Sequence, residues 1–473
     1  MNWKILLVAG LATAGTAVAS TAVMATTQDG SAVCDTYLDV DVNGDKLADV
    51  VVPEPHATVD GVTEAGRVVV YYGGGKGLQV ITQNTPGVPG AAEAGDRFGN
   101  ATAVTDLNGD GCQELSIAAA DEDLGGTANA GGVWFVPGGA TGLDLTSTSL
   151  ITQDSSGVPG TAEAGDRFGG AVAGTVASTG GILAVGVPGE NGASGAVYVK
   201  QHDHVWAVTQ NSPGIPGDAE PGDRYGEVLT ALHGVVVVGV PHEDIGAIKD
   251  AGIVQYLGPT ATSVAHLRTV TQNSTGVSGT PEAGDRFGAS LDTDRMVKSD
   301  EGSELLAIGV PGESLTSADA DHGMVHLLIA DFLAPEYGYV ERHVHQNTAG
   351  VLGVAEATDQ FGEQVNISSF RLPGEDFERV ALTVVSPHEE HDAEQGDAPA
   401  IQAFLLDPDL GAADQWVQQG SYGLPTDAEL TTAYAEGRDT SLYLEDAVGA
   451  HVYAVPWGNV LVGRTDPVVV YTA

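Results

Sequence analysis

Basic residues are scarce in this chain. Its 473 residues include 18 Lys and Arg against 64 Asp and Glu, which gives a formal net charge of −46. Nucleic-acid binding needs clustered Lys and Arg, so this composition excludes a nucleic-acid partner. The charged partners that remain are cations, above all calcium, and basic surfaces. Alternatively, the acidic residues only keep a secreted protein soluble.

Cysteine is nearly absent, with Cys34 and Cys112 as the two examples. A single pair in an exported protein usually forms a disulfide, and two free thiols are the alternative. Two cysteines without neighbouring pairs of histidines do not make a zinc site.

Long apolar runs are missing beyond the N-terminus. Residues 1–25 contain one lysine, an apolar run and then small residues, which is typical of a secretory signal peptide cleaved after Ala19 or Ala25. An uncleaved N-terminal anchor is the alternative. The run is short and rich in Gly and Ala for a membrane span, so we expect a secreted or cell-surface protein with no transmembrane span in the mature chain.

Catalytic signatures are also missing. We find no G-x-S-x-G, P-loop, Cys–His nucleophile pair or zinc-protease motif, and we assign no catalytic residue. Carboxylate pairs for sugar hydrolysis remain open in so acidic a chain, although none stands out. Two histidine pairs, His343 with His345 and His388 with His391, have spacings that suit a transition metal. Neither pair has a convincing third ligand in the sequence.

One phrase is present four times, and a worn fifth copy follows. The first copy reads TPGVPGAAEAGDRFG, and the copies occupy residues 85–99, 155–169, 212–226, 274–288 and 348–362. Self-similarity at a long period indicates a repeat architecture in which one small unit recurs.

Each unit reads as about four short strands. Runs rich in Val and Ile are separated by clusters of Gly, Pro, Asn and Asp, and no window sustains a helical pattern. One leading, five clear and one trailing unit predict an all-β, seven-bladed β-propeller of four-stranded antiparallel blades, in one domain over residues 26–473. An open β-solenoid is the alternative. The predicted blades start near residues 34, 98, 168, 225, 287, 361 and 422.

The Phe-Gly anchors, the apolar strands ending in Gly-Val-Pro or Ser-Pro, and a D-x-N-G-D loop together resemble FG-GAP repeats. These are the units of the N-terminal β-propeller of integrin α subunits, and the resemblance covers nearly the whole mature chain. It implies seven blades, with calcium in loops between the first and second strands of some of them. It does not imply an integrin, because the other integrin domains have no counterpart here.

Two acidic loops are the strongest chemical signal. Side-chain oxygens recur at positions 1, 3, 5 and 9, and the carbonyl of position 7 completes the set. Calcium prefers six to eight oxygen ligands, carboxylates among them. A metal-free Asn-Gly turn is the alternative. The predicted ligands of the two calcium ions are Asp41, Asn43, Asp45, Leu47 and Asp49 in the first loop, and Asp106, Asn108, Asp110, Cys112 and Glu114 in the second.

The repeated Gly-Asp-Arg-Phe phrase has several equal copies, which argues against one catalytic site. Asp fixes a turn through its own backbone, Arg bridges carboxylates and the aromatic ring packs between blades. These predicted blade joints are Asp96, Arg97, Phe98, Asp166, Arg167, Phe168, Asp223, Arg224, Tyr225, Asp285, Arg286 and Phe287.

The sequence therefore predicts a secreted, monomeric calcium-binding propeller. We expect a non-catalytic binding or adhesion module whose variable loops contact a protein or glycan ligand. The alternatives are a hydrolase, or a hydrolase accessory domain, acting on surface lipids or glycans, and a structural envelope protein.

Overall fold

A computed structural model describes most of the chain. The described residues are 7–8, 34, 40–295, 304–315, 321–330, 338–372, 375, 378–390, 397–406, 414–425, 430–434, 441–446 and 451–472. The predicted signal peptide, residues 1–25, lies outside them except for the two residues of the first strand. The chain forms two compact units, one of Met1–Glu243 with Val254–Thr269 and one of Asp244–Ile253 with Val270–Ala473.

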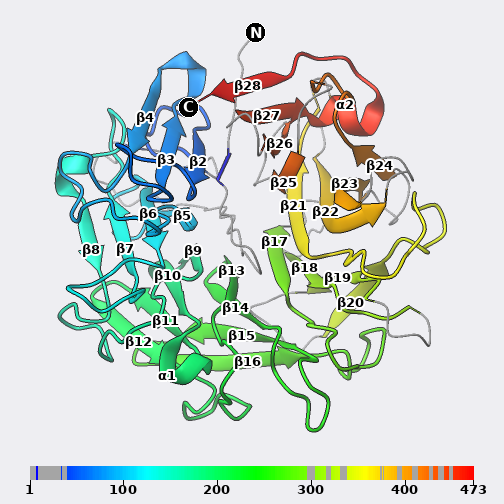
Figure 1. The fold of residues 1–473 in the computed structure, drawn as a ribbon, viewed down its shortest axis with the longest axis horizontal. Helices are drawn as coiled ribbons and strands as arrows, with labels where there is room; N and C mark the ends of the chain where they lie inside the picture. The colour runs from blue at the N-terminus through cyan, green and yellow to red at the C-terminus, as the bar shows by residue number, and fades with distance from the viewer. Residues whose placement is uncertain are drawn as a thin grey trace. The chain divides into compact units, whose positions relative to one another are not determined.

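The first unit contains four four-stranded sheets in chain order (Figure 1). Their strands are β1 (Leu7–Val8), β2 (Val50–Glu54), β3 (Arg67–Tyr71) and β4 (Leu78–Ile81); β5 (Ala101–Thr105), β6 (Glu114–Ala119), β7 (Gly132–Val136) and β8 (Ser149–Ile151); β9 (Val172–Ala177), β10 (Gly180–Val187), β11 (Ala196–Gln201) and β12 (His204–Val208); and β13 (Val228–Leu232), β14 (Val235–Val240), β15 (Ile253–Pro259) and β16 (Val264–Val270).

The second unit contains three four-stranded sheets. Their strands are β17 (Ser290–Arg295), β18 (Glu304–Val310), β19 (Met324–Ala330) and β20 (Tyr339–Val344); β21 (Gln364–Phe370), β22 (Arg379–Glu390), β23 (Asp397–Leu405) and β24 (Asp414–Val417); and β25 (Leu430–Tyr434), β26 (Ser441–Asp446), β27 (His451–Pro456) and β28 (Val469–Thr472). The described helices are the short segments η1 (Gly73–Gly75), η2 (Leu145–Ser147), α1 (Glu190–Ala193) and α2 (Trp457–Val462).

The sheets are meanders of neighbouring antiparallel strands, as in β5 to β8 and β9 to β12. The first sheet differs, because β1 pairs in parallel with β2. Seven four-stranded sheets with almost no helix confirm the predicted fold class, a seven-bladed β-propeller. The solenoid alternative is wrong.

Burial explains why the middle strands read as continuous apolar runs. Every residue of β6, β7 and β14 is buried, as expected for strands covered on both faces. The last strand of a sheet is more exposed, and β4 and β12 each bury one residue fully. Loops that leave the first and second strands therefore begin from well-buried positions.

The repeated aromatic anchors join consecutive sheets within each unit. Phe98 and Phe168 are almost fully buried, and their backbone N–H groups donate to the carbonyls of Ala65 and Ala130 in the preceding repeat. The ring of Phe98 meets the edge of Trp134 at a centroid distance of 5.2 Å. Strand β5 begins at Ala101, shortly after Phe98, so the anchor sets where its sheet starts.

Candidate metal loops

The first acidic loop, residues 41–49, leads directly into β2 and is wrapped around its own side chains. The two carboxylate oxygens of Asp41 accept the N–H groups of Asp45 (3.1 Å) and Lys46 (2.8 Å). Asp49 accepts the N–H of Val42 at 3.0 Å and so closes the loop. Hydrogen bonds of Asx type to nearby amides are the usual way in which Asp and Asn fix such turns.

The second acidic loop, residues 106–114, connects β5 to β6 and repeats this arrangement. Asp106 accepts the N–H groups of Gly109 (2.7 Å) and Gly111 (3.0 Å). Glu114 accepts the N–H of Leu107 at 2.8 Å, the same contact that Asp49 makes in the first loop. The longer side chain of Glu114 therefore makes the same hydrogen bond as the aspartate at the ninth position of the first loop.

Positions 3 and 5 also match between the two loops. The side chains of Asn43 and Asn108 each accept the N–H two residues ahead, at 3.0 and 2.7 Å. Asp45 and Asp110 do the same at 2.7 and 2.8 Å. Positions 3, 5 and 9 thus make matching hydrogen bonds in both loops, and the aspartate at position 1 accepts the N–H of position 6 in each.

The two loops are bound to each other, which the sequence did not reveal. The N–H of Asp41 donates to the side-chain oxygen of Gln113 at 2.7 Å. Cys34 and Cys112 form a disulfide, and Cys34 packs directly against Gly44, where an added Cβ would lie 2.6 Å from the Cys34 Cβ. A hydrogen bond therefore joins the two loops directly, and the disulfide ties the second loop to Cys34, which packs against the first.

The loops concentrate negative charge in partly buried surroundings. Asp41 and Asp49 are fully buried, and Glu114 is 5% exposed. Burial raises the pKa of Asp49 and of Glu114 to about 7, and neighbouring carboxylates add to each shift. Lys76 is the cation seen against the first loop, with its ammonium 2.6 Å from Asp45.

The donor set of each loop fits a calcium ion in its chemistry. Both provide carboxylate and amide oxygens, the ligands that calcium takes, and they hold buried carboxylates whose mutual repulsion a cation would relieve. Among the described residues, no three His, Cys, Asp or Glu side chains already converge as ligands of one ion. The oxygens point instead to backbone N–H groups of the loops.

The repeated Asp and Arg side chains build the joints between repeats. Asp96, Asp166 and Asp223 each accept the N–H of the glutamate three residues earlier, at 2.6 to 2.7 Å. Arg167 reaches across to Asp121 of the preceding repeat at 2.7 Å. By contrast Arg224 pairs with Glu227 beside it, so the arginines do not all bridge repeats.

In the other copies, Asp285 accepts the N–H of Glu282 at 2.5 Å, and Arg286 lies 3.5 Å from Glu363. Tyr225 and Phe287 are fully buried, as Phe168 nearly is. The described joint side chains are thus engaged in turns, ion pairs and packing.

A hydrogen bond between a glutamine and a glutamate recurs between repeats, and the sequence did not predict it. The glutamine of each Thr-Gln phrase, or of its His-Gln variant in the fifth copy, donates to a glutamate at the end of the second strand of the next sheet or just after it. The pairs are Gln83–Glu122, Gln153–Glu190, Gln210–Glu243, Gln272–Glu313 and Gln346–Glu389. Both residue types recur at fixed places in the repeats, so the signal was present, but their pairing required the fold.

The histidines fall into two groups. His391 lies outside the described residues, so the pair of His388 and His391 has no structural account. His343 and His345 stack with ring centroids 6.1 Å apart, and the fold adds His326 and Glu341 beside them. Sequence spacing missed His326 because it lies on the preceding strand, whereas Glu341 stands two residues before His343 and its spacing was visible in the sequence.

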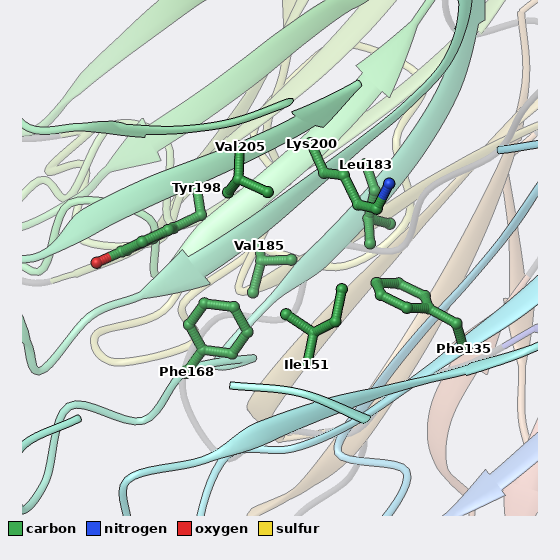
Figure 2. A pocket seen from close by; sticks show the side chains of 8 residues that line it. All are labelled: Phe135, Ile151, Phe168, Leu183, Val185, Tyr198, Lys200 and Val205. Carbon is green, nitrogen blue, oxygen red and sulfur yellow. The ribbon is translucent and has the colours of Figure 1, made fainter. Parts of the chain in front are cut away.

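One small cavity lies between the second and third sheets (Figure 2). Its volume is ≈ 10 Å³, room for about one water-sized sphere. It is lined by Phe135, Ile151, Phe168, Leu183, Val185, Tyr198, Lys200 and Val205. The lining is almost wholly apolar, so it has neither the room nor the polar groups of a substrate site.

Helices that could cross a membrane are not found in the described part of the chain. The predicted ligand-contacting loops follow β6, β10, β14, β18 and β22, and parts of the last two lie outside the described residues.

Comparison with known proteins identifies one repeat directly. The FG-GAP repeat family model matches residues 98–136, from the Phe98 anchor through β7. Phosphatidylinositol-glycan-specific phospholipase D of Mus musculus is 34% identical over 114 residues, which is 24% of this chain and 14% of that protein. The Rattus norvegicus protein of the same name is 34% identical over 116 residues, with the same coverages. The chain thus spans about a seventh of these relatives.

Solved structures give more distant matches. Hydrazine synthase of Kuenenia stuttgartiensis has 12% identity and a TM-score of 0.35, covering 86% of this chain and 92% of that one. A triple arginine-to-alanine mutant of AofleA from Arthrobotrys oligospora has 9% identity and a TM-score of 0.36, covering 79% and 86%. The chain thus contains an FG-GAP repeat at residues 98–136, and this match together with the seven four-stranded sheets fits the integrin-α-like propeller that the sequence resembles.

Proposed function

We propose that this protein is a calcium-stabilised propeller that acts outside the cell as a non-catalytic binding module for a protein or glycan. The observation that carries the calcium part is the matched geometry of the two acidic loops. Each loop holds four oxygen-bearing side chains at the same sequence positions, and each contains a buried carboxylate that accepts a backbone N–H of its own loop. Residues 41–49 and 106–114 would each hold one ion, which would supply the charge compensation that the loops need.

The proposed binding role rests on the rigid propeller fold and on the variable loops that it carries. Propeller repeats provide a rigid frame, and binding residues usually lie on the variable loops of such frames. The repeated joint residues are engaged in structure, which leaves the loops after the second strands as the variable surface. The disulfide between Cys34 and Cys112 supports a location in an oxidising compartment.

Binding of immobilised glycans and extracellular proteins, in calcium and in chelator, tests this function. We expect wild-type protein to bind a defined subset in calcium and to lose that binding in chelator. Asp110→Ala should weaken it, whereas Asp218→Ala, at an exposed aspartate in a different loop, should leave it intact. An identical binding pattern in calcium and chelator would contradict the calcium part, and no binding at all would contradict the module.

A second candidate is an accessory module of a hydrolase that acts on glycolipids. It is favoured by the 34% identity to phosphatidylinositol-glycan-specific phospholipase D over 114 residues. That match covers a small part of the enzyme. Release of a glycosylphosphatidylinositol-anchored reporter from vesicles by the purified chain would favour a catalytic role over the binding module.

A further inference from the structure

A group of histidines gathers on the third and fourth strands of the fifth sheet, within the second unit. Glu341 and His343 lie on β20, two residues apart, and His345 follows directly after that strand (Figure 1). Residues at this spacing share one face of a strand. His326 on β19 is the registered neighbour of His343, so imidazoles from both strands meet on one face.

The contacts within this histidine cluster centre on one carboxylate oxygen. Oε1 of Glu341 lies 2.7 Å from Nδ1 of His326 and 3.3 Å from Nδ1 of His343. The ring centroids of His326 and His343 are 6.1 Å apart, and the same distance separates His343 from His345. Three imidazoles and a carboxylate are therefore consecutive neighbours in one cluster, and they do not converge on a single point in this arrangement.

Buried nitrogen atoms in the cluster lack hydrogen-bond partners. His326 is fully buried, and its Nε2 has no partner. Nδ1 of His345 is also buried without one, and Nδ1 of His343 makes no well-aligned hydrogen bond despite its approach to Glu341. Unsatisfied buried polar atoms are uncommon and call for a ligand or another explanation.

The fold itself does not require histidine at these places. The third residue of the third strand is Trp134 in the second sheet and Gln255 in the fourth, and both donate to a carbonyl of the preceding Gly-x-Pro-Gly loop. Gln402 makes the equivalent bond in the sixth sheet. In the fifth sheet the hydrogen bond to this loop comes from the fourth strand, where Glu341 accepts from the hydroxyl of Ser278 at 3.0 Å. His326 therefore does not make the hydrogen bond of its counterparts, and its ring packs beside the anchor Phe287 at a centroid distance of 5.5 Å.

We propose that His326, His343, His345 and Glu341 form a binding site for a divalent transition metal of the zinc class. Imidazole and carboxylate are typical zinc ligands, and four-coordinate geometry is the rule for structural sites. Two histidines at alternate positions of one strand and a third from the neighbouring strand can face one ion. The rings must rotate to bind it, because the four side chains do not converge on one point and the Nδ1 atoms of His326 and His343 now face Glu341.

This site is chemically distinct from the acidic loops. Those loops contain oxygen ligands alone, which suit calcium, whereas imidazole nitrogen favours zinc and similar ions. The four residues also belong to the second unit, whereas both acidic loops belong to the first. Zinc binding can therefore be measured with calcium in excess, and its loss would not affect the proposed calcium sites.

Calorimetric titration of the full chain with zinc chloride, in excess calcium, tests the proposal. Wild type should bind one zinc ion, and the double variant His343→Ala/His345→Ala should weaken that affinity by at least about tenfold. The matched control is His202→Ala/His204→Ala, which removes an exposed histidine pair of the same spacing and should retain wild-type affinity. His326→Gln introduces the residue found at this position in two other sheets, so it should fold and still lose zinc.

Cobalt provides a second measurement on the same variants. Wild type should give the visible absorption of cobalt in a nitrogen-containing tetrahedral site, and His326→Gln should not. The proposal is overturned if wild type binds zinc no more tightly than His343→Ala/His345→Ala. It is also overturned if the control variant loses as much affinity as the cluster variants do.

Discussion

The buried glutamates of the repeated Gln–Glu contacts carry an energetic cost at neutral pH. Glu122 is 8% exposed and accepts from Gln83 at 2.5 Å, and no ion pair to it is found among the described residues. Burial raises the pKa of Glu122 to about 7, and the nearby carboxylate of Asp96 adds to the shift. Burial likewise raises the pKa of Glu389 to about 7. In the folded protein these groups bind protons more tightly than in the unfolded chain.

A raised carboxyl pKa makes stability fall as pH rises. Between the unfolded pKa of 4.5 and the folded value of about 7, the folded state binds more protons than the unfolded state, so the free energy of unfolding decreases with pH. The glutamine side chain of Glu122→Gln is uncharged at every pH, so this variant should lose less stability than wild type as pH rises. We expect the variant to gain about 1–3 kcal/mol relative to wild type between about pH 5 and pH 8, as measured by urea unfolding.

Glu163→Gln is the matched control for that experiment, because Glu163 is exposed. Its unfolding free energy should follow the wild-type pH dependence. If Glu122→Gln and wild type changed in parallel over this pH range, the buried carboxyl would not be the source of the pH dependence.

At the scale of elements, glycines that contact the aromatic anchors decide how closely consecutive repeats approach. Gly66 has a φ of +81°, and an added Cβ would lie 2.3 Å from the carbonyl oxygen of Phe98. Gly61 has a similar φ of +89° but no atom within 4 Å of that position. The two glycines therefore separate the cost of the backbone conformation from the cost of the contact.

Alanine substitution at these two glycines should give unequal losses. Gly61→Ala is expected to cost about 1 kcal/mol, because a left-handed conformation disfavours a side chain. Gly66→Ala should cost at least about 2 kcal/mol more, since overpacking against backbone displaces the anchor. Chemical denaturation of both variants measures the difference. Equal losses would show that the joint between repeats tolerates a side chain at residue 66.

At the scale of the whole molecule, the sequence predicted the fold class because the repeated phrase and the short apolar strands are visible in one dimension. The two acidic loops were equally visible, since Asp and Asn recur at fixed spacings within nine residues. The link between those loops was not visible. It depends on Gln113 reaching Asp41 across 72 positions, and the sequence left the state of the two cysteines open.

Contacts between different strands were missed for the same reason. The Gln–Glu pairs join residues some 33 to 43 positions apart, and His326 meets His343 only because β19 and β20 are adjacent. Local patterns identify turns and strands, whereas a polar partner from another strand appears only when the sheet register is known. The strand β1 and its parallel pairing were likewise unexpected in a segment that was predicted as a signal peptide.

The central claim is that the paired acidic loops bind calcium, and the number of calcium ions bound per chain tests it most directly. Equilibrium dialysis followed by metal analysis should give two ions for wild type and for the control Asp218→Ala. Asp41→Ala and Asp110→Ala should each retain one ion, and the double variant should retain none. If wild type and the double variant bound the same amount of calcium, the account of these loops as metal sites would be wrong.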